Sequence, residues 1–454
     1  MSNVKLSFKV LKQRMVVFVL VIIAFFIPQL SENQNSIDIR AMITALGIDK
    51  KGDEYEVTAQ LFVPSKSQPN KDIISAKDKT ISLAAEQLYV KTARLAVEST
   101  CALIMLGKDL VEQENVMPVL DYMVRNNVIT WNALVAVSDQ EASKALVELN
   151  KLESKSPIGW LNFFDVSNRG YDYAAVQLRD FIKGVYGITG TSYCPLLTTE
   201  KIPSEGQGGT GGSSGGGENA SGGGGGDGSQ GSFNPIKNDG AVFTQSSGSS
   251  GGSEGGSSGG SSGGGSEEKK GQAPQLKLEG KTNVFVKGKK IAELNKDETE
   301  GMNWMNEKAV FHSIKLSDVG GYYFRDGDIT LGIINKKLKI KSQFDSNPTV
   351  IINMKIQLDL EEVMQSDIPL VIGKNDVVQK SKLLNQKTAE YIEQKIRHIF
   401  EKSKELKADV LELVPLFNKY HNKKFKKFLE TGRQPIDILD EIELKFELLT
   451  EVEV

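Results

Sequence analysis

The chain contains few residues of the types that catalyse reactions or bind metals. Its three histidines are His312, His398 and His421, and none has a second histidine, a cysteine or a carboxylate at metal-ligand spacing. No nucleophile elbow, Walker A loop or dinucleotide-binding glycine motif occurs outside a glycine-rich tract. We therefore expect no catalytic, cofactor-binding or metal-binding residues, no cofactor, and a protein that is not an enzyme.

Other reactive side chains have simple structural interpretations. A catalytic carboxylate pair from distant positions stays open, but Glu361, Glu362 and the acidic residues within 441–453 are typical of solvated faces. Trp304 is expected in a core, with a contact surface as the alternative. Cys101 lies in an apolar run and predicts a buried free thiol, although export would permit a disulfide with Cys194.

A basic run covers residues 418–427. Five lysines alternate there with aromatic residues: Lys419, Tyr420, Lys423, Lys424, Phe425, Lys426 and Lys427, with Phe428 following. A basic face near an anionic leaflet would add membrane affinity of about 1 kcal/mol per charge. The simpler alternative is a solvated amphipathic helix.

The first thirty residues predict a membrane segment. Lys5, Lys9, Lys12 and Arg14 precede an uncharged apolar run over residues 15–28. Because positive charge stays cytoplasmic, we expect the bulk of the chain to be extracytoplasmic. The run would rise roughly 20 Å as a helix, a length that also suits a removed signal peptide, but no small-x-small cleavage pattern follows it. An uncleaved anchor is the favoured interpretation.

Composition fits an exported protein with more than one domain. The chain has 454 residues and a formal net charge of −3, and the four basic residues at its start leave −7 for the remainder. A balance of this sign does not attract nucleic acid. We expect no nucleic-acid partner.

Glycine divides the chain. Of its 44 glycines, 27 lie between Gly206 and Gly271, interleaved with serine, which predicts a disordered linker over residues 201–274. This gives a membrane segment over 1–30, an N-terminal mixed α/β domain over 31–200 and a C-terminal α/β domain over 275–454. Across so flexible a linker the two domains need not hold a fixed separation. The tract could equally be an expanded surface loop.

Periodicity predicts the elements of the first domain. Residues 43–63 form two apolar runs joined by a charged turn, and we expect a hairpin with Tyr55, Val57, Ala59, Leu61 and Val63 facing the core and Glu54, Glu56, Thr58 and Gln60 facing water. Helices are expected over 81–97, 110–125, 141–149 and 171–186, and strands over 102–106 and 128–137.

The second domain starts with a predicted hairpin over residues 276–294. Asn295 and Glu298 then form a capping-box pattern. Alternation predicts long strands over 329–340 and 350–360 and a closing strand over 442–448, with a long helix starting near Val378. The fold class is therefore α+β, or mixed α/β: several mixed-sheet domains with helices packed on the sheets, preceded by the N-terminal membrane segment.

Four stretches in this order resemble the Ger(x)C family, the C subunits of nutrient germinant receptors of bacterial endospores. They are residues 44–50 (Thr-Ala-Leu-Gly-Ile-Asp-Lys), 104–110 (Ile-Met-Leu-Gly-Lys-Asp-Leu) with Val119, Leu120, Asp121, Tyr122 and Arg125, 276–285 (Leu-Lys-Leu-Glu-Gly-Lys-Thr-Asn-Val-Phe) and 405–410 (Glu-Leu-Lys-Ala-Asp-Val). The resemblance covers residues 30–454 apart from the glycine tract.

The resemblance implies a non-catalytic subunit on the outer face of the spore inner membrane. Its implied partners are the membrane and the integral-membrane A and B subunits of a germinant receptor, and we expect no small molecule to bind this subunit directly. Family members usually carry a lipid on a cysteine after the signal peptide. No cysteine precedes Cys101 here, so we expect no lipid-attachment residue.

The sequence departs from the family pattern at two further places. Asn126 follows Arg125 where an acidic residue is common in the family, and the glycine-rich insertion is unusual. An exported solute-binding module and a cell-envelope scaffold remain alternative functions.

Overall fold

The structure is a computed structural model of the chain. It describes residues 15, 40–63, 70–92, 94–125, 129–152, 174–200, 275–307, 309, 313–317, 319, 328–364 and 374–453. The predicted membrane segment, apart from Met15, and the glycine-rich tract lie outside this range. Among the residues it does describe, no helix combines the length and the apolar character needed to cross a membrane.

The first sheet is mixed and has nine strands. Eight follow the order β3-β2-β1-β5-β6-β7-β8-β9, and the short β4 pairs with β1. The strands are β1 (Arg40–Lys51), β2 (Glu54–Val63), β3 (Asn70–Asp78), β4 (Leu95–Val97), β5 (Leu103–Leu106), β6 (Leu134–Ser138), β7 (Thr191–Glu200), β8 (Gln275–Val286) and β9 (Lys289–Leu294). Strands β1, β5, β6 and β7 run parallel, while β2, β3, β8 and β9 extend the sheet with antiparallel pairs.

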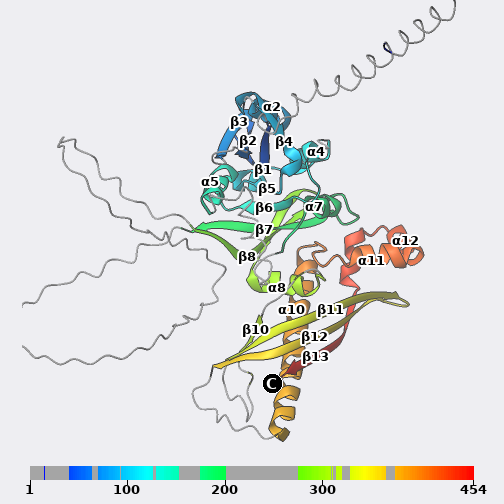
Figure 1. Cartoon of the computed structure of the whole chain (residues 1–454). Helices are drawn as coiled ribbons and strands as arrows, with labels where there is room; N and C mark the ends of the chain where they lie inside the picture. The colour runs from blue at the N-terminus through cyan, green and yellow to red at the C-terminus, as the bar shows by residue number, and fades with distance from the viewer. Residues whose placement is uncertain are drawn as a thin grey trace, which may run out of the picture.

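Helices cover both faces of this sheet (Figure 1). On β5, Leu103 and Met105 pack with α5 (Ala142–Leu152), whereas Ile104 and Leu106 pack into a second cluster on the opposite face. That second cluster takes residues from α2 (Ile81–Thr92), α3 (Lys108–Gln113), α4 (Met117–Arg125) and α7 (Leu178–Val185). Alternate residues of a strand point to opposite faces, so a parallel strand buried on both sides is apolar throughout.

Because helices cover both faces of the first sheet, one prediction for the β1–β2 hairpin is wrong. The strands form as predicted, and Val57, Ala59 and Leu61 are buried. Thr58 and Gln60, expected to face water, are also buried. Gln60 donates to the side chain of Asn150 on α5 at 2.9 Å, and Thr58 bonds to Ser75 on β3 at 2.8 Å. The prediction assumed one solvated face, but α5 covers it.

Several predicted elements have different boundaries. The helix expected over 81–97 ends at Thr92, and Leu95–Val97 is instead strand β4. The helix expected over 110–125 is two helices, because the side chain of Asn115 accepts from the backbone N–H of Met117 and starts a new one. The strand expected over 128–137 begins only at Leu134, and the last predicted helix begins only at Leu178.

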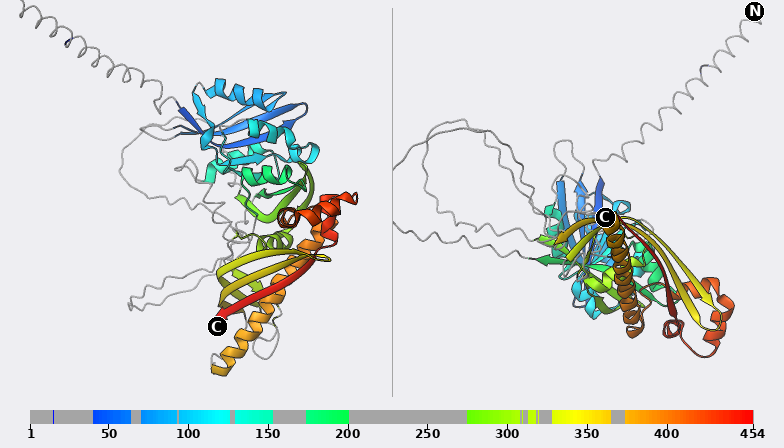
Figure 2. Two further views of the ribbon diagram at one scale, coloured as in Figure 1. Left: turned by 90° about the vertical axis from the view of Figure 1, so that its right-hand side faces the viewer. Right: turned by 90° about the horizontal axis from the view of Figure 1, so that it is seen from below.

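The second sheet has four strands in the order β10-β11-β12-β13. These are β10 (Ser313–Leu316), β11 (Asp328–Phe344), β12 (Pro348–Met364) and β13 (Glu443–Glu453), with β12 and β13 parallel. The long helix α10 (Lys374–Glu405) lies along one face of this sheet (Figures 1 and 2). Three shorter helices, α8 (Lys296–Trp304), α11 (Val414–Tyr420) and α12 (Asn422–Glu430), complete this half. The predicted mixed α/β fold class is confirmed.

The β8–β9 hairpin connects the two halves. Strand β8 pairs with β7 in the first sheet, yet its two faces serve different cores: Phe285 packs in the first and Val284 in the second. Glu200 at the end of β7 is paired with Gln275 at the start of β8, so the chain leaves and re-enters the fold at one place. The predicted linker over residues 201–274 would permit a variable separation, but the pairing of β7 with β8 holds the start of the second half on the first sheet. The division into domains at this tract stays a prediction.

Candidate functional site

The residues first considered for chemistry do not come together. His312 lies outside the described residues, His398 is largely exposed, and the Nε2 atom of His421 lies 2.9 Å from the carbonyl oxygen of Ser342. Glu361 and Glu362 are exposed. Within the described ranges, no group of three or more His, Cys, Asp or Glu side chains is placed to hold a metal ion.

Both cysteines are buried free thiols. Burial raises the pKa of Cys101 to about 12 and that of Cys194 still further. A thiol with so high a pKa is not a nucleophile at neutral pH. The expectation for Cys101 is confirmed.

The first buried polar junction joins strand β1 to helix α5. Asp49, at the end of the 44–50 stretch, accepts hydrogen bonds from the backbone N–H groups of Ala142 at 2.7 Å and Ser143 at 2.9 Å. These are two of the unpaired donors at the start of α5, and a carboxylate also complements the helix dipole there. Burial raises the pKa of Asp49, and the two N–H groups oppose that rise.

Glycines make room for this junction. A Cβ atom added to Gly107 would lie 1.9 Å from an Asp49 carboxylate oxygen, and one added to Gly47 would lie 2.9 Å from Leu146 of α5. Two of the four stretches that indicated the family therefore meet at one place, where they seat α5 on the sheet.

The second junction joins both halves of the molecule. Asp409, in the 405–410 stretch, accepts from the backbone N–H groups of Leu413 and Val414 at 2.8 Å each, and so caps helix α11. Its own N–H donates to the hydroxyl of Thr191 on β7 of the first sheet at 3.1 Å. Asp409 is buried, and burial raises its pKa to about 7 against the effect of the two N–H groups.

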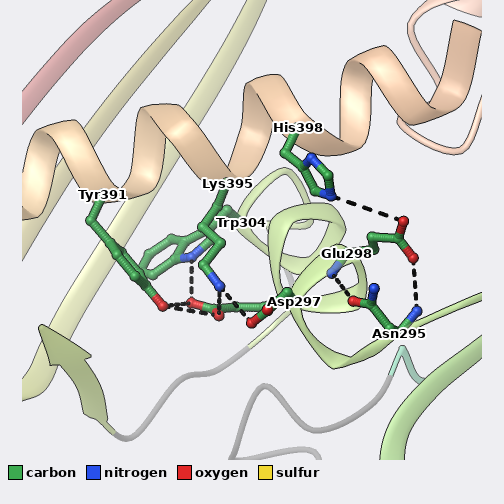
Figure 3. Close-up of polar contacts among 8 residues, drawn as sticks. Asn295, Asp297, Glu298, Trp304, Tyr391, Lys395 and His398 are labelled. Atoms are coloured by element: carbon green, nitrogen blue, oxygen red, sulfur yellow. Dashed lines mark hydrogen bonds and ion pairs between the residues drawn. The ribbon is translucent and has the colours of Figure 1, made fainter. Parts of the chain in front are cut away.

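The third junction is a polar cluster between helices α8 and α10 (Figure 3). The buried carboxylate of Glu300 accepts from the Tyr391 hydroxyl at 2.8 Å and the Trp304 indole N–H at 3.3 Å, and its second oxygen lies 3.1 Å from the Lys395 ammonium. Lys395 also bonds to Asp297 at 2.7 Å, which lowers the pKa of that carboxyl. All of Glu300's partners are side chains of the same two helices, so the cluster fixes how they pack.

The termini of α8 are also satisfied. Asn295 and Glu298 form the predicted capping box at its start, at 3.0 and 2.8 Å. At its end, Lys336 from β11 donates to the carbonyl of Asn306 at 2.8 Å, and burial lowers the pKa of this lysine to about 7. Trp304 is fully buried in the core, as expected.

Replacing Glu300 with alanine should lower the free energy of unfolding by about 2 to 4 kcal/mol, because three buried or half-buried donors lose their acceptor. Chemical unfolding of the detergent-solubilised chain measures this. The control is Glu293→Ala, which removes an exposed carboxylate paired with Lys290 at 3.7 Å and should cost less than about 0.5 kcal/mol. Equal effects of the two variants would contradict this interpretation of the cluster.

These junctions were not predicted from the sequence. Asp49 and Asp409 lie in stretches that pointed to the family, but no role could be assigned to them. For Asp409 a signal existed: it precedes an apolar run with Pro415 in the first turn of the helix, a pattern of helix starts. Glu300 had no such signal, since its partner Tyr391 lies 91 residues away along the chain.

Comparison with known proteins agrees with the order of the motifs. A family model described as the spore germination protein N-terminal domain matches residues 33–199, and one described as spore germination B3/GerAC-like, C-terminal, matches residues 280–449. A solved structure titled "Crystal Structure of the GerBC protein" aligns with 90% of this chain and 97% of its own, at 15% identity and a TM-score of 0.42. No curated protein matches the chain.

The two matches define a spore germination protein with an N-terminal and a C-terminal family domain. The chain belongs to the Ger(x)C family, the C subunits of germinant receptors.

Proposed function

We propose that this chain is a non-catalytic, membrane-associated subunit of a spore germinant receptor, needed for receptor assembly and for nutrient-triggered germination. The observation that carries the proposal is the match of both family models, in order, to the two halves of the chain. The partners would be the integral-membrane A and B subunits, on the outer face of the spore inner membrane.

Two further observations bear on the proposal. The buried carboxylates of Asp49, Asp409 and Glu300 each hold a helix in place. Where family members usually carry a lipid, this sequence has no cysteine. Membrane attachment would therefore rest on the basic and apolar residues at its start.

Deleting the gene should give spores that form normally but fail to respond to some nutrients. Loss of refractility after nutrient addition measures the response, and a non-nutrient trigger that bypasses receptors is the control. Complementation with the full chain should restore the response. Normal nutrient germination by the deletion strain would refute the proposal.

Solute capture is tested separately. If the chain captured a solute, one amino acid or sugar would raise the melting temperature of the purified chain saturably and specifically. The proposal expects no such gain, and it expects the tagged chain to co-purify with integral-membrane partners from spore membranes.

A further inference from the structure

Residues 419–433, which include helix α12, form a basic segment in an otherwise acidic protein. Residues 419–433 contain five lysines, one arginine and one glutamate, a formal charge of +5, while the whole chain carries −3. The rest of the chain therefore carries −8. So strong a local asymmetry creates a field that attracts anionic surfaces.

Helix α12 presents this charge on one face. Phe425 and Phe428 are buried on its inner side. Lys423, Lys426 and Lys427, at spacings of three and four residues, share the opposite side and are exposed. We call these three side chains the α12 lysine face.

Within the part of the chain that the structure describes, no carboxylate forms an ion pair with the α12 lysine face. The nearby Lys424 contrasts with it, since its ammonium bonds to the carbonyl oxygens of Phe344 and Asp345 in the β11–β12 turn. Beside the face, Tyr420 is 61% exposed, and Lys419 lies over its ring at 4.8 Å. An exposed tyrosine next to lysines is typical of side chains at a membrane interface.

We propose that the α12 lysine face binds the anionic headgroups of a membrane surface, as a second contact besides the N-terminal segment. The inference rests on the membrane attachment proposed above. An anionic lipid surface fits better than a protein, because the face consists of three exposed lysine point charges and contains no arginine fork for bidentate recognition.

The N-terminal attachment permits this contact. Residues 29–39 separate the apolar run from Arg40 at the start of β1. Eleven residues span at most about 35 to 40 Å when extended, so the start of β1 stays within that distance of the bilayer. Each lysine that comes within a Debye length of an anionic leaflet adds about 1 kcal/mol of attraction.

The experiment is lysine footprinting of the full chain in vesicles of two compositions. The protein is reconstituted in phosphatidylcholine alone or with about 30% phosphatidylglycerol, and brief acetylation is quantified by mass spectrometry. We expect the α12 lysine face to react at least about threefold more slowly with the anionic lipid, and this protection to disappear at about 0.5 M salt. Lys337 and Lys339, exposed on β11, should react equally in both.

A pair of variants controls for local structure. Hydrogen exchange of α11 and α12 should slow with anionic vesicles in the wild type and in the control Lys337→Gln/Lys339→Gln/Lys341→Gln. It should not change in Lys423→Gln/Lys426→Gln/Lys427→Gln. Thermal unfolding confirms that both variants are folded.

The outcomes separate this inference from the proposed function. If the chain floats with the vesicles but its α12 lysine face reacts equally in both lipids, the lipid contact is overturned and the membrane attachment stands. Protection that requires an added integral-membrane partner, in neutral lipid, would assign the face to an acidic protein instead. A chain that floats with neither vesicle overturns both proposals.

Discussion

Replacing Asp409 with alanine is expected to lower the free energy of unfolding by about 2 to 4 kcal/mol. The carboxylate accepts the N–H groups of Leu413 and Val414, both buried residues, and without it these donors have no acceptor. Its loop also bonds to Thr191, so the damage should reach the contact between the two halves. Urea unfolding followed by fluorescence measures the change, and Trp304 lies in the affected half.

The exposed Asp345 supplies a matched control. Its side chain is 93% exposed in the turn between β11 and β12. The Asp345→Ala variant should therefore unfold within about 0.5 kcal/mol of the wild type. Comparable losses in both variants would show that Asp409 has no special structural role.

The carboxyl of Asp409 should make the free energy of unfolding depend on pH. Its pKa is raised from 3.8 to about 7 in the folded state, so its contribution is fully present below pH 3.8 and is lost as pH rises through about 7. The Asp409→Asn variant has no titrating group there. We expect the stability of the wild type relative to this variant to fall by a few kcal/mol, in order of magnitude, between pH 4 and 7.5. A difference that is constant with pH would contradict the raised pKa.

Replacing Asp49 with alanine should cost about 2 to 3 kcal/mol, because the first turn of α5 loses the acceptor for two N–H groups. Urea unfolding measures this as well. The control is Asp53→Ala, which changes an exposed residue of the β1–β2 turn.

A double-mutant cycle tests whether Gly107 and Asp49 act together. Gly107→Ala alone should be strongly destabilising, since its Cβ would lie 1.9 Å from the Asp49 carboxylate. In the Asp49→Ala background that clash is gone, so the same change should cost at least about 1 kcal/mol less. Additive effects would show that the two residues are not coupled.

The elements that were predicted well are those with a strong local pattern. The β1–β2 hairpin, the capping box at Asn295 and the alternating strands β11 and β12 are all determined by residues close together in the chain. Alternation and turn or cap residues within a few positions are enough to predict that such an element forms, even where they do not predict which of its faces are buried.

The features that were missed depend on distant residues. Thr58 and Gln60 are polar, and only the position of α5 shows that they are buried. Strand β4 cannot be told from the end of a helix by sequence, because three apolar residues show no period. The contacts of Asp49 with Ala142, of Asp409 with Thr191 and of Glu300 with Tyr391 join residues 93, 218 and 91 positions apart, and no local pattern records such contacts. Only the cap that Asp409 makes on α11 is local.

The pairing of Glu200 with Gln275 also bears on how the protein can be engineered. Because the sequence between them begins and ends at paired residues, its length should affect the fold through loop-closure entropy, which grows with the logarithm of the number of residues. A fluorescent reporter inserted between these two residues should leave the pairing of β7 with β8 intact. The glycine-rich tract is thus a suitable place to insert another domain.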